Sequence, residues 1–395
     1  MNNFKIILLG FLLIGLFLIS PLRAQNDGKI VLGNAQIDRY LPILKGKRVA
    51  CVVNQTSCIG RTHLVDSLLR LKVNIVKIFA PEHGFRGEAD AGEKIHNGKD
   101  PQTGLQVMSL YGENKTPQAK DLNDIEILVF DIQDVGARFY TYISTLHYLL
   151  KASGDFNIPV LVLDRPNPNG HYVDGPVLEM AHQSFVGIAP IPVVHGLTIG
   201  EFAKMSVGQG WIKSKHKPKI TVIPCKNYTH ATPYAPEIRP SPNLPNYKSI
   251  LLYPTLCFLE GTPFSVGRGT DLPFQMVGHP NLTRSDTSIL IRSLSGAKNP
   301  PLLGQKIPAI TFRNTDAKSS NFHQIDLDLL LDLYRQWKDK DERFFLKNGF
   351  WTKLAGTLTL QKDMEAGKTA EQIRASWQPA LKKYAKMRKK YLLYK

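Results

Sequence analysis

The stretch IEILVFDIQDVGARFYTY, residues 125–142, decides the fold class of this chain. It opens with an unbroken apolar run, which is typical of a strand whose two sheet faces are both covered by helices. Two acids and an amide, Asp131, Gln133 and Asp134, follow the run, and helical periodicity predicts a helix over residues 138–153. A buried strand that ends in polar residues and leads into a helix indicates an α/β sheet.

The same pattern recurs along the first half of the chain. A helix is expected at residues 63–72, and apolar runs predict strands at 48–53, 73–80, 106–110, 160–163 and 191–194. The carboxyl ends of parallel strands meet at one edge of an open sheet, where ligands bind. Polar residues stand at these ends: Asn54, Gln55, Glu82, His83, Asp131, Gln133, Asp164 and Arg165. We therefore expect a Rossmann-like, mostly parallel sheet with helices on both faces.

A smaller domain is expected after a proline-rich segment. Residues 232–247 hold five prolines and little periodicity, which marks a boundary. Turn-forming residues predict an ordered loop at 252–280, and helical patterns occur at 285–294, 325–338 and 369–391. We therefore assign residues 25–248 to a Rossmann-like catalytic domain and residues 249–395 to a smaller C-terminal α+β domain that closes a cleft.

Residues 1–24 have the pattern of a cleaved secretory signal peptide. Lys5 precedes an apolar run at 6–19, and a small residue, Ala24, stands at the expected cleavage point. The run is too short to predict a membrane span, so we expect an exported protein, periplasmic or extracellular, with no membrane contact after cleavage. The chain carries a formal net charge of +17, so outside the inner membrane we expect anionic wall polymers or carboxylated sugars as partners, and no nucleic acid.

Several common catalytic motifs are missing from the sequence. No Gly-rich dinucleotide fingerprint or Walker-type loop occurs, so no nucleotide cofactor is expected. The sequence lacks HExxH and CxxC, so no metal is expected, and it lacks G-x-S-x-G, which argues against a serine hydrolase. Carboxylates are the candidate catalytic groups that remain. They suit glycosidic bond cleavage, in which one acid protonates the leaving oxygen and a second group acts at the anomeric carbon.

The loop PEHGFRGEADAGEK, residues 81–94, is too polar for packing alone. It contains four carboxylates, of which only Glu82 directly follows the apolar strand predicted at 73–80. His83 and Arg86 stand beside it. Loops at strand ends often carry function, so this loop is expected to form one wall of a binding site.

Further motifs supply candidate binding residues. In DIQDVGARFYTY, the planar donors of Arg138 suit a carboxylate, and the ring of Tyr142 suits a sugar. In DRPNPNG, the amides of Asn167 and Asn169 can bond hydroxyl or acetamido groups. SVGRGT presents Arg268 between two glycines, which allow close approach of the backbone to a ligand. A structural ion pair is the alternative role for either arginine.

Two more groups lie further along the chain. VDGPVLE contributes the acids Asp174 and Glu179, and His195 follows the strand predicted at 191–194. Glu201 is the third helical residue after Thr198, a spacing that predicts a capping box at the start of a helix.

The following motifs occur in chain order: PEHGFRGEADAGEK, DIQDVGARFYTYISTLHY, LDRPNPNG, VDGPVLE, SPNLPN, SVGRGT and the closing KYLLY. In these motifs the chain resembles the exo-β-N-acetylmuramidases of peptidoglycan turnover. The resemblance implies an exported glycoside hydrolase that removes terminal, non-reducing N-acetylmuramic acid from peptidoglycan fragments and needs no cofactor. It also implies a site in the cleft between a Rossmann-like domain and a smaller domain. The alternative is a peptidoglycan-binding protein that uses the same cleft without catalysis.

By this resemblance, the glutamate of the PEHG motif falls on Glu82, which is expected to be the general acid. The second catalytic group stays open among Asp131, Asp164 and Glu179, as base, nucleophile or orienter of the substrate acetamido group. Muramic acid carries a lactyl carboxylate, so a selective site should contain an arginine. The candidate substrate-binding residues are His83, Arg86, Gln133, Arg138, Tyr142, Arg165, Asn167, Asn169, Asp174, His195 and Arg268.

Overall fold

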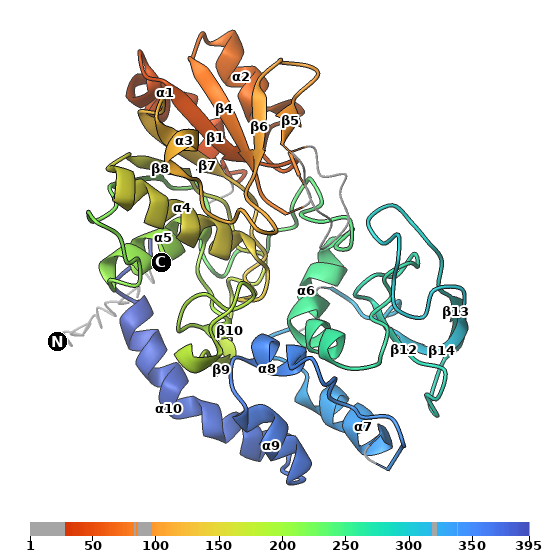
Figure 1. Cartoon of the computed structure of the whole chain (residues 1–395). Coiled ribbons are helices and arrows are strands. Elements are labelled where there is room, and N and C mark those ends of the chain that lie inside the picture. The colour runs from red at the N-terminus through yellow and green to blue at the C-terminus, as the bar shows by residue number, and fades with distance from the viewer. Residues whose placement is uncertain (1–27, 83, 86–96, 318–321, 338, 395) are drawn as a thin grey trace, which may run out of the picture.

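A computed structural model of the chain describes residues 28–82, 84–85, 97–317, 322–337 and 339–394 (Figure 1). Its largest element is a seven-stranded sheet in the order β11-β8-β7-β1-β4-β6-β5. All neighbouring strands in it pair in parallel except β5 with β6. The strands are β1 (Val49–Val53), β4 (Ile75–Ala80), β5 (Gly98–Lys99), β6 (Gln106–Ser109), β7 (Ile127–Asp131), β8 (Val160–Leu163) and β11 (Ile220–Ile223).

Both faces of this sheet are covered, as the unbroken apolar runs predicted. Ala50 and Val52 of β1 pack in one hydrophobic cluster with α4 (Tyr142–Phe156) and α5 (Ile199–Gly208). The alternate residues of β1 belong to a second cluster with α1 (Ile37–Leu44) and α2 (Leu64–Arg70). Side chains of a strand alternate between faces, so the two clusters are the two sides of one sheet. The expected Rossmann-like fold class is confirmed.

Smaller elements surround the sheet and form the second half of the molecule. The strands are β2 (Cys58–Ile59), β3 (Thr62–His63), β9 (Asp174–Val177), β10 (Pro192–Val194), β12 (Met276–Gly278), β13 (Thr287–Leu290) and β14 (Lys306–Thr311). The helices are α3 (Ala119–Leu122), α6 (Tyr247–Leu256), α7 (Leu327–Trp337), α8 (Phe350–Ala355), α9 (Thr359–Glu365) and α10 (Ala370–Arg388), with 3-10 turns η1 (Gly33–Ala35), η2 (Met180–His182) and η3 (Cys257–Gly261). No helix among the described residues is both long enough and apolar enough to cross a membrane.

Three local predictions differ from the structure. The strand predicted at 191–194 is β10, but it pairs antiparallel with β9 outside the main sheet. The segment predicted as loop at 252–280 contains the end of α6, then η3 and β12. The helix predicted at 285–294 is instead β13, which pairs antiparallel with β14. The strands β10, β12 and β13 each depend on pairing with another segment, which the local pattern does not show.

The C-terminal segment returns to the Rossmann-like half. In Figure 1, α10 leads back from α9, and the C-terminus lies beside α5. Tyr384 Oη donates to the carbonyl of His195 at 2.7 Å, and Arg388 Nη2 donates to that of Gly196 at 2.7 Å. The last described residue, Tyr394, is buried and donates through Oη to Asp164 Oδ2 at 2.6 Å. The end of the chain therefore fastens the second half to the sheet.

Candidate active site

A cavity of about 1080 Å³ lies where residues of the Rossmann-like half meet the second half of the chain. Glu82, Tyr111 and Thr141 line it from the first half, and Glu260 and Arg268 line it from the second. A volume of this size accommodates a small ligand or a sugar. The cavity therefore joins polar groups that are far apart in the sequence.

Glu82 stands just beyond β4, where Pro81 ends the strand. Its Oε2 accepts a hydrogen bond from Thr141 Oγ1 at 2.8 Å, and the hydroxyl of Tyr111 is also bonded to its side chain. Burial, and then the charge of Glu82, raise the pKa of Tyr111 above its usual value, so this phenol stays protonated and donates. Tyr111 follows β6, the parallel neighbour of β4, and Thr141 is the N-cap residue of α4. The sheet edge thus orients the Glu82 carboxyl group.

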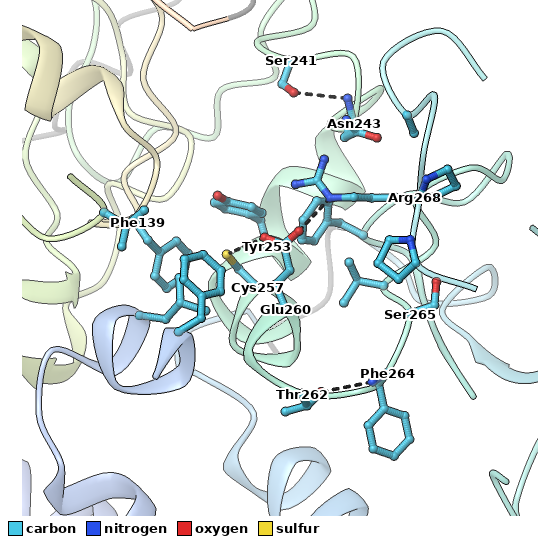
Figure 2. A pocket seen from close by; sticks show the side chains of 18 of the residues that line it. Phe139, Ser241, Asn243, Tyr253, Cys257, Glu260, Thr262, Phe264, Ser265 and Arg268 are labelled. Atoms are coloured by element: carbon cyan, nitrogen blue, oxygen red, sulfur yellow. Dashed lines mark hydrogen bonds and ion pairs between the residues drawn. The ribbon is translucent and has the colours of Figure 1, made fainter. Parts of the chain in front are cut away.

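Glu260 faces the cavity from η3 and is paired with Arg268 (Figure 2). Arg268 Nε donates to Glu260 Oε1 at 2.7 Å, and Cys257 Sγ donates to Glu260 Oε2 at 3.5 Å. The guanidinium also lies over the ring of Phe274, 5.1 Å from its centroid. These contacts hold one carboxylate and one cation on the same wall.

The loop that carries Arg268 requires its two glycines. Gly267 and Gly269 have φ of 86° and 78°, a conformation that side chains other than glycine rarely adopt. A Cβ on Gly269 would also lie 2.4 Å from the carbonyl oxygen of Arg292. The glycines therefore fix the path of the backbone on either side of Arg268.

Aromatic rings form a second wall of the cavity. Phe139 and Tyr253 meet edge to face with centroids 5.3 Å apart, and Tyr253 meets Phe274 in the same way at 4.9 Å. Figure 2 shows Phe139 pointing toward Tyr253. Aromatic faces beside carboxylates and an arginine are the groups that bind a charged sugar.

Of the four acids named from the sequence as catalytic, only Glu82 lines this cavity. Asp131 is fully buried and accepts from Arg165 Nε at 2.5 Å and Nη2 at 3.0 Å. Asp164 is fully buried and accepts from Thr198 Oγ1 at 2.8 Å as well as from the tyrosine at the C-terminus. Glu179 accepts from Thr357 Oγ1 at 2.6 Å. The structure therefore gives these three carboxylates partners within the protein.

Arg268 is the one described candidate binding residue that lines the cavity. Arg138 is fully buried and donates to four backbone carbonyls, and Asp174 is paired with Arg374 at 2.6 Å. The following candidates are buried elsewhere in the fold: Gln133, Tyr142, Arg165, Asn167, Asn169 and His195. His83 and Arg86 lie outside the described residues.

Asp134 and His195 form a buried pair away from the cavity. Their Oδ2 and Nε2 atoms are 3.8 Å apart, and Asp134 Oδ2 accepts from the backbone N–H of Gly136 at 2.7 Å. Burial raises the pKa of Asp134 to about 7 and lowers the pKa of His195 to about 3. Near neutral pH the histidine is therefore neutral, and the pair is not an ion pair.

Glu260, Tyr111 and Thr141 were not predicted from the sequence. Glu260 stands eight positions before Arg268, and this proximity of an acid to SVGRGT was the available signal. Thr141 and Tyr111 gave none, because they reach Glu82 only through the fold. Among the described residues, no group of three or more His, Cys, Asp or Glu side chains is placed to hold a metal ion.

Comparison with known proteins places the chain in a family. The model for the N-terminal part of exo-beta-N-acetylmuramidase NamZ matches residues 49–248, and the model for its C-terminal part matches residues 251–394. The peptidoglycan beta-N-acetylmuramidase NamZ of Bacillus subtilis strain 168 is 36% identical over 391 residues, covering 91% of this chain and 90% of that protein.

Two crystal structures of DUF1343 family proteins from Bacteroides fragilis NCTC 9343 share the fold. One is 45% identical with a TM-score of 0.86, and the other is 26% identical with a TM-score of 0.80. Each similarity covers 93% of this chain and 99% of the other. The resemblance found in the sequence motifs is confirmed, and the chain belongs to the NamZ exo-β-N-acetylmuramidase family of glycoside hydrolases.

Proposed function

We propose that this protein is an exported exo-β-N-acetylmuramidase that removes terminal, non-reducing N-acetylmuramic acid from peptidoglycan fragments during cell-wall turnover. Membership of the NamZ family supports the reaction class, and the name of the Bacillus subtilis relative supports a peptidoglycan substrate. The observation that carries the proposal is the cavity, which combines the oriented carboxyl group of Glu82 with the Glu260–Arg268 pair.

Glu82 is the proposed general acid. Thr141 and Tyr111 bind its side chain, so the carboxyl group is held at the cavity wall before substrate arrives. Cleavage needs a proton on the leaving oxygen and stabilisation of positive charge at the anomeric carbon. Glu260 is the proposed source of that stabilisation, since its carboxylate lines the same cavity, whereas Asp131, Asp164 and Glu179 are bonded elsewhere.

Arg268 is the proposed partner of the lactyl carboxylate. Its Nε is bonded to Glu260, and within the described residues no hydrogen bond engages Nη1 or Nη2. These two nitrogens are the donors with which arginine binds carboxylates in a fork. The basic charge of the whole chain would also concentrate anionic wall fragments around the protein.

The test is release of the chromophore from an aryl β-N-acetylmuramic acid glycoside. Glu82→Gln should lower kcat by about 10²–10⁴-fold, the usual contribution of a general acid, while muropeptide binding is retained. Glu126→Gln, the same chemical change at an exposed residue paired with Arg48, is the control and should retain full turnover. Undiminished turnover in Glu82→Gln would remove Glu82 from the mechanism.

The same assay separates the proposal from the non-catalytic alternative. Wild-type protein that binds muropeptides but liberates no N-acetylmuramic acid would favour a wall-binding module. Export is tested by expressing the full chain in a bacterial host and determining the N-terminus of the protein recovered outside the inner membrane. Protein that keeps residues 1–24 in the cytoplasm would contradict the export proposal.

A further inference from the structure

The motif SPNLPN, residues 241–246, brings two asparagines to the start of α6. Asn246 caps the helix, because its Oδ1 accepts from the backbone N–H of Ser249 at 2.9 Å. Asn243 is only 4% exposed, yet it lines the active-site cavity together with Ser241. The two asparagines therefore differ in role: Asn246 supports the helix, and Asn243 is within reach of a ligand in the cavity.

Hydrogen bonds fix the orientation of the Asn243 side chain. Its Nδ2 donates to the carbonyl of Gly296 at 2.7 Å. A carbonyl can only accept, so the nitrogen and the oxygen of this amide cannot be exchanged. The backbone N–H of Asn243 also donates to Ser241 Oγ at 3.2 Å, and that of Leu244 donates to the Ser241 carbonyl at 3.1 Å. The turn and the amide are therefore held in place before a ligand binds.

The amide oxygen of Asn243 is the atom left for a ligand. Among the described residues no donor is bonded to Oδ1. Oδ1 is not one of the fully buried side-chain atoms that lack a partner, so it keeps accessible surface at the cavity that Asn243 lines. An acceptor in a nearly buried position needs a donor, which a ligand N–H or O–H can supply and a carboxylate cannot.

Asn243 is connected to the general-acid side of the cavity through Pro240. The carbonyl of Pro240 accepts from Tyr140 Oη at 2.7 Å. Tyr140 directly precedes Thr141, the residue that donates to Glu82. The three residue steps from Pro240 to Asn243 span at most about 11 Å. The turn that carries Asn243 is therefore fastened close to the proposed general acid.

Asn243 is also connected to the loop that carries Arg268. The loop that contains Gly296 begins near Arg292, whose backbone N–H donates to the carbonyl of Gly269 at 2.8 Å. Gly269 directly follows Arg268 in the chain. Figure 2 shows Asn243 and Arg268 on the same side of the pocket. One short loop thus bonds to both residues and fixes Asn243 relative to the arginine.

We propose that Asn243 determines specificity for the acetamido group of the substrate, with Oδ1 accepting a hydrogen bond from the acetamido N–H. This inference rests on the proposed function and adds a recognition residue to it. In muramic acid the anomeric carbon, the carbon with the acetamido group and the carbon with the lactyl ether are consecutive ring atoms. Glu82 acts at the first and Arg268 binds the group on the third, so a side chain connected to both meets the second.

The experiment is isothermal titration calorimetry of the full chain with two ligands that have no glycosidic bond to break. One ligand is 1-deoxy-N-acetylmuramic acid, and the other is its ester analogue, in which an oxygen replaces only the acetamido N–H. Asn243→Ala removes the acceptor, and Asn243→Asp keeps an acceptor but loses the bond to Gly296. Asn123→Ala, at an exposed position after α3, is the matched control.

The wild type should bind the amide ligand about tenfold or more tightly than the ester ligand, which leaves an almost buried acceptor unpaired. Asn243→Ala should lose this preference. Asn243→Asp should keep it at a lower affinity for both ligands, because its charge repels the lactyl carboxylate. Asn123→Ala should bind both ligands as the wild type does. A merely structural role of Asn243 would weaken the binding of both ligands equally in both of its variants.

Three outcomes would overturn the proposal: a wild type that does not distinguish the ligands or binds neither, a preference that survives in Asn243→Ala, and a preference lost in both Asn243 variants. If Asn243→Ala does not fold, the wild-type comparison of the two ligands still decides. Hydrolysis of the aryl N-acetylmuramic acid glycoside tests the proposed function separately. Hydrolysis without a ligand preference refutes only the role of Asn243, and a preference without hydrolysis refutes only the catalysis.

Discussion

Two arginines that look alike in the sequence have different environments in the fold. Arg138 is fully buried, and its guanidinium donates to the carbonyls of Pro176, Ile191, Leu354 and Ala355 at 2.7 to 2.8 Å. Burial lowers the pKa of Arg138 to about 9, so it stays charged at neutral pH. Arg268 has one nitrogen on Glu260 and faces the cavity. The first arginine serves structure, and the second is available to a ligand.

Substitution of these arginines should separate recognition from stability. Arg268→Ala should reduce the preference for muramic acid over glucosamine aryl glycosides by about 10- to 100-fold, the value of a hydrogen bond to a charged group. Arg138→Ala should instead lower the free energy of unfolding by about 3 kcal/mol or more, because it leaves buried carbonyls unpaired. Kinetics on both glycosides and urea denaturation of each variant measure the two effects. An unchanged preference in Arg268→Ala contradicts the proposed lactyl contact.

Glu260 can be tested for a direct role at the anomeric carbon. Glu260→Gln keeps an oxygen for Arg268 Nε and removes the negative charge. If the charge stabilises the transition state, kcat should fall by about 10²-fold or more while KM changes little. The steady-state parameters of the variant on the aryl glycoside decide this. A higher KM with unchanged kcat would show that Glu260 only positions Arg268.

At the scale of elements, five strands of the main sheet (β1, β4, β6, β7 and β8) were predictable, whereas the edge strands β5 and β11 and the side-chain partners were not. The central strands β1, β7 and β8 are apolar runs because both of their faces are buried, which is a property of the strand itself. Glu82 was predictable because it directly follows such a run. Asp131 also follows a strand, but Arg165 neutralises it, and no local pattern shows that pairing. Glu260 reaches the cavity only because the fold brings η3, which packs against α6 and α8, to the same cavity as Glu82.

The closing KYLLY segment has a structural role that the sequence does not indicate. In the sequence it is only one motif of the family resemblance, whereas in the structure Tyr394 is buried and donates to Asp164. The Tyr394 hydroxyl also accepts from the backbone N–H of Cys225 at 2.8 Å. One hydroxyl thus satisfies two buried groups next to the strand β8.

Tyr394→Phe should therefore destabilise the protein while leaving its surface unchanged. Removal of the hydroxyl leaves a buried carboxyl oxygen and a buried N–H each without this partner, at a cost of about 1–3 kcal/mol. Urea denaturation measures the loss, with Tyr391→Phe as the control, since Tyr391 is bonded to Gln209 on a more exposed side. Equal stability of Tyr394→Phe and wild type would show that the tail does not fasten the sheet.

At the scale of the whole molecule, the cavity depends on how the two halves are joined. Arg138 links β9 and the residue before β10 to α8, and α10 bonds to the loop after β10. These contacts involve residues far apart in the chain, so the relative placement of Glu82 and Arg268 is a property of the assembled fold. Motif order alone identified the family, but only the three-dimensional structure distinguishes residues that line the cavity from those that support it.

The buried pair of Asp134 and His195 makes the stability of the molecule depend on pH. Between about pH 4 and pH 7, folded Asp134 keeps a proton that the unfolded chain releases, so its contribution to stability falls as pH rises. His195 acts in the opposite sense, because the unfolded chain binds a proton below about pH 6.5 that the folded protein does not. The two effects on stability partly cancel in the wild type. A substitution that removes one titrating group should therefore make the pH dependence caused by the other visible.

Asp134→Asn should gain stability relative to wild type as pH rises from 4 to 7, by at most about 1.4 kcal/mol per pH unit, with no further gain above pH 7. The amide cannot ionise, so the variant avoids the cost of a buried charge. His195 is present in both proteins, so its contribution cancels when the stabilities of variant and wild type are subtracted. Urea denaturation at pH 4.5, 6 and 8 measures the difference in the free energy of unfolding between the variant and wild type. Asp155→Asn is the control: Lys151 lowers the pKa of Asp155 below its usual value, so Asp155 is ionised in both the folded and the unfolded chain, and its replacement should change stability equally at all three pH values. Parallel pH profiles for Asp134→Asn and wild type would mean that Asp134 is ionised in the folded protein throughout this range.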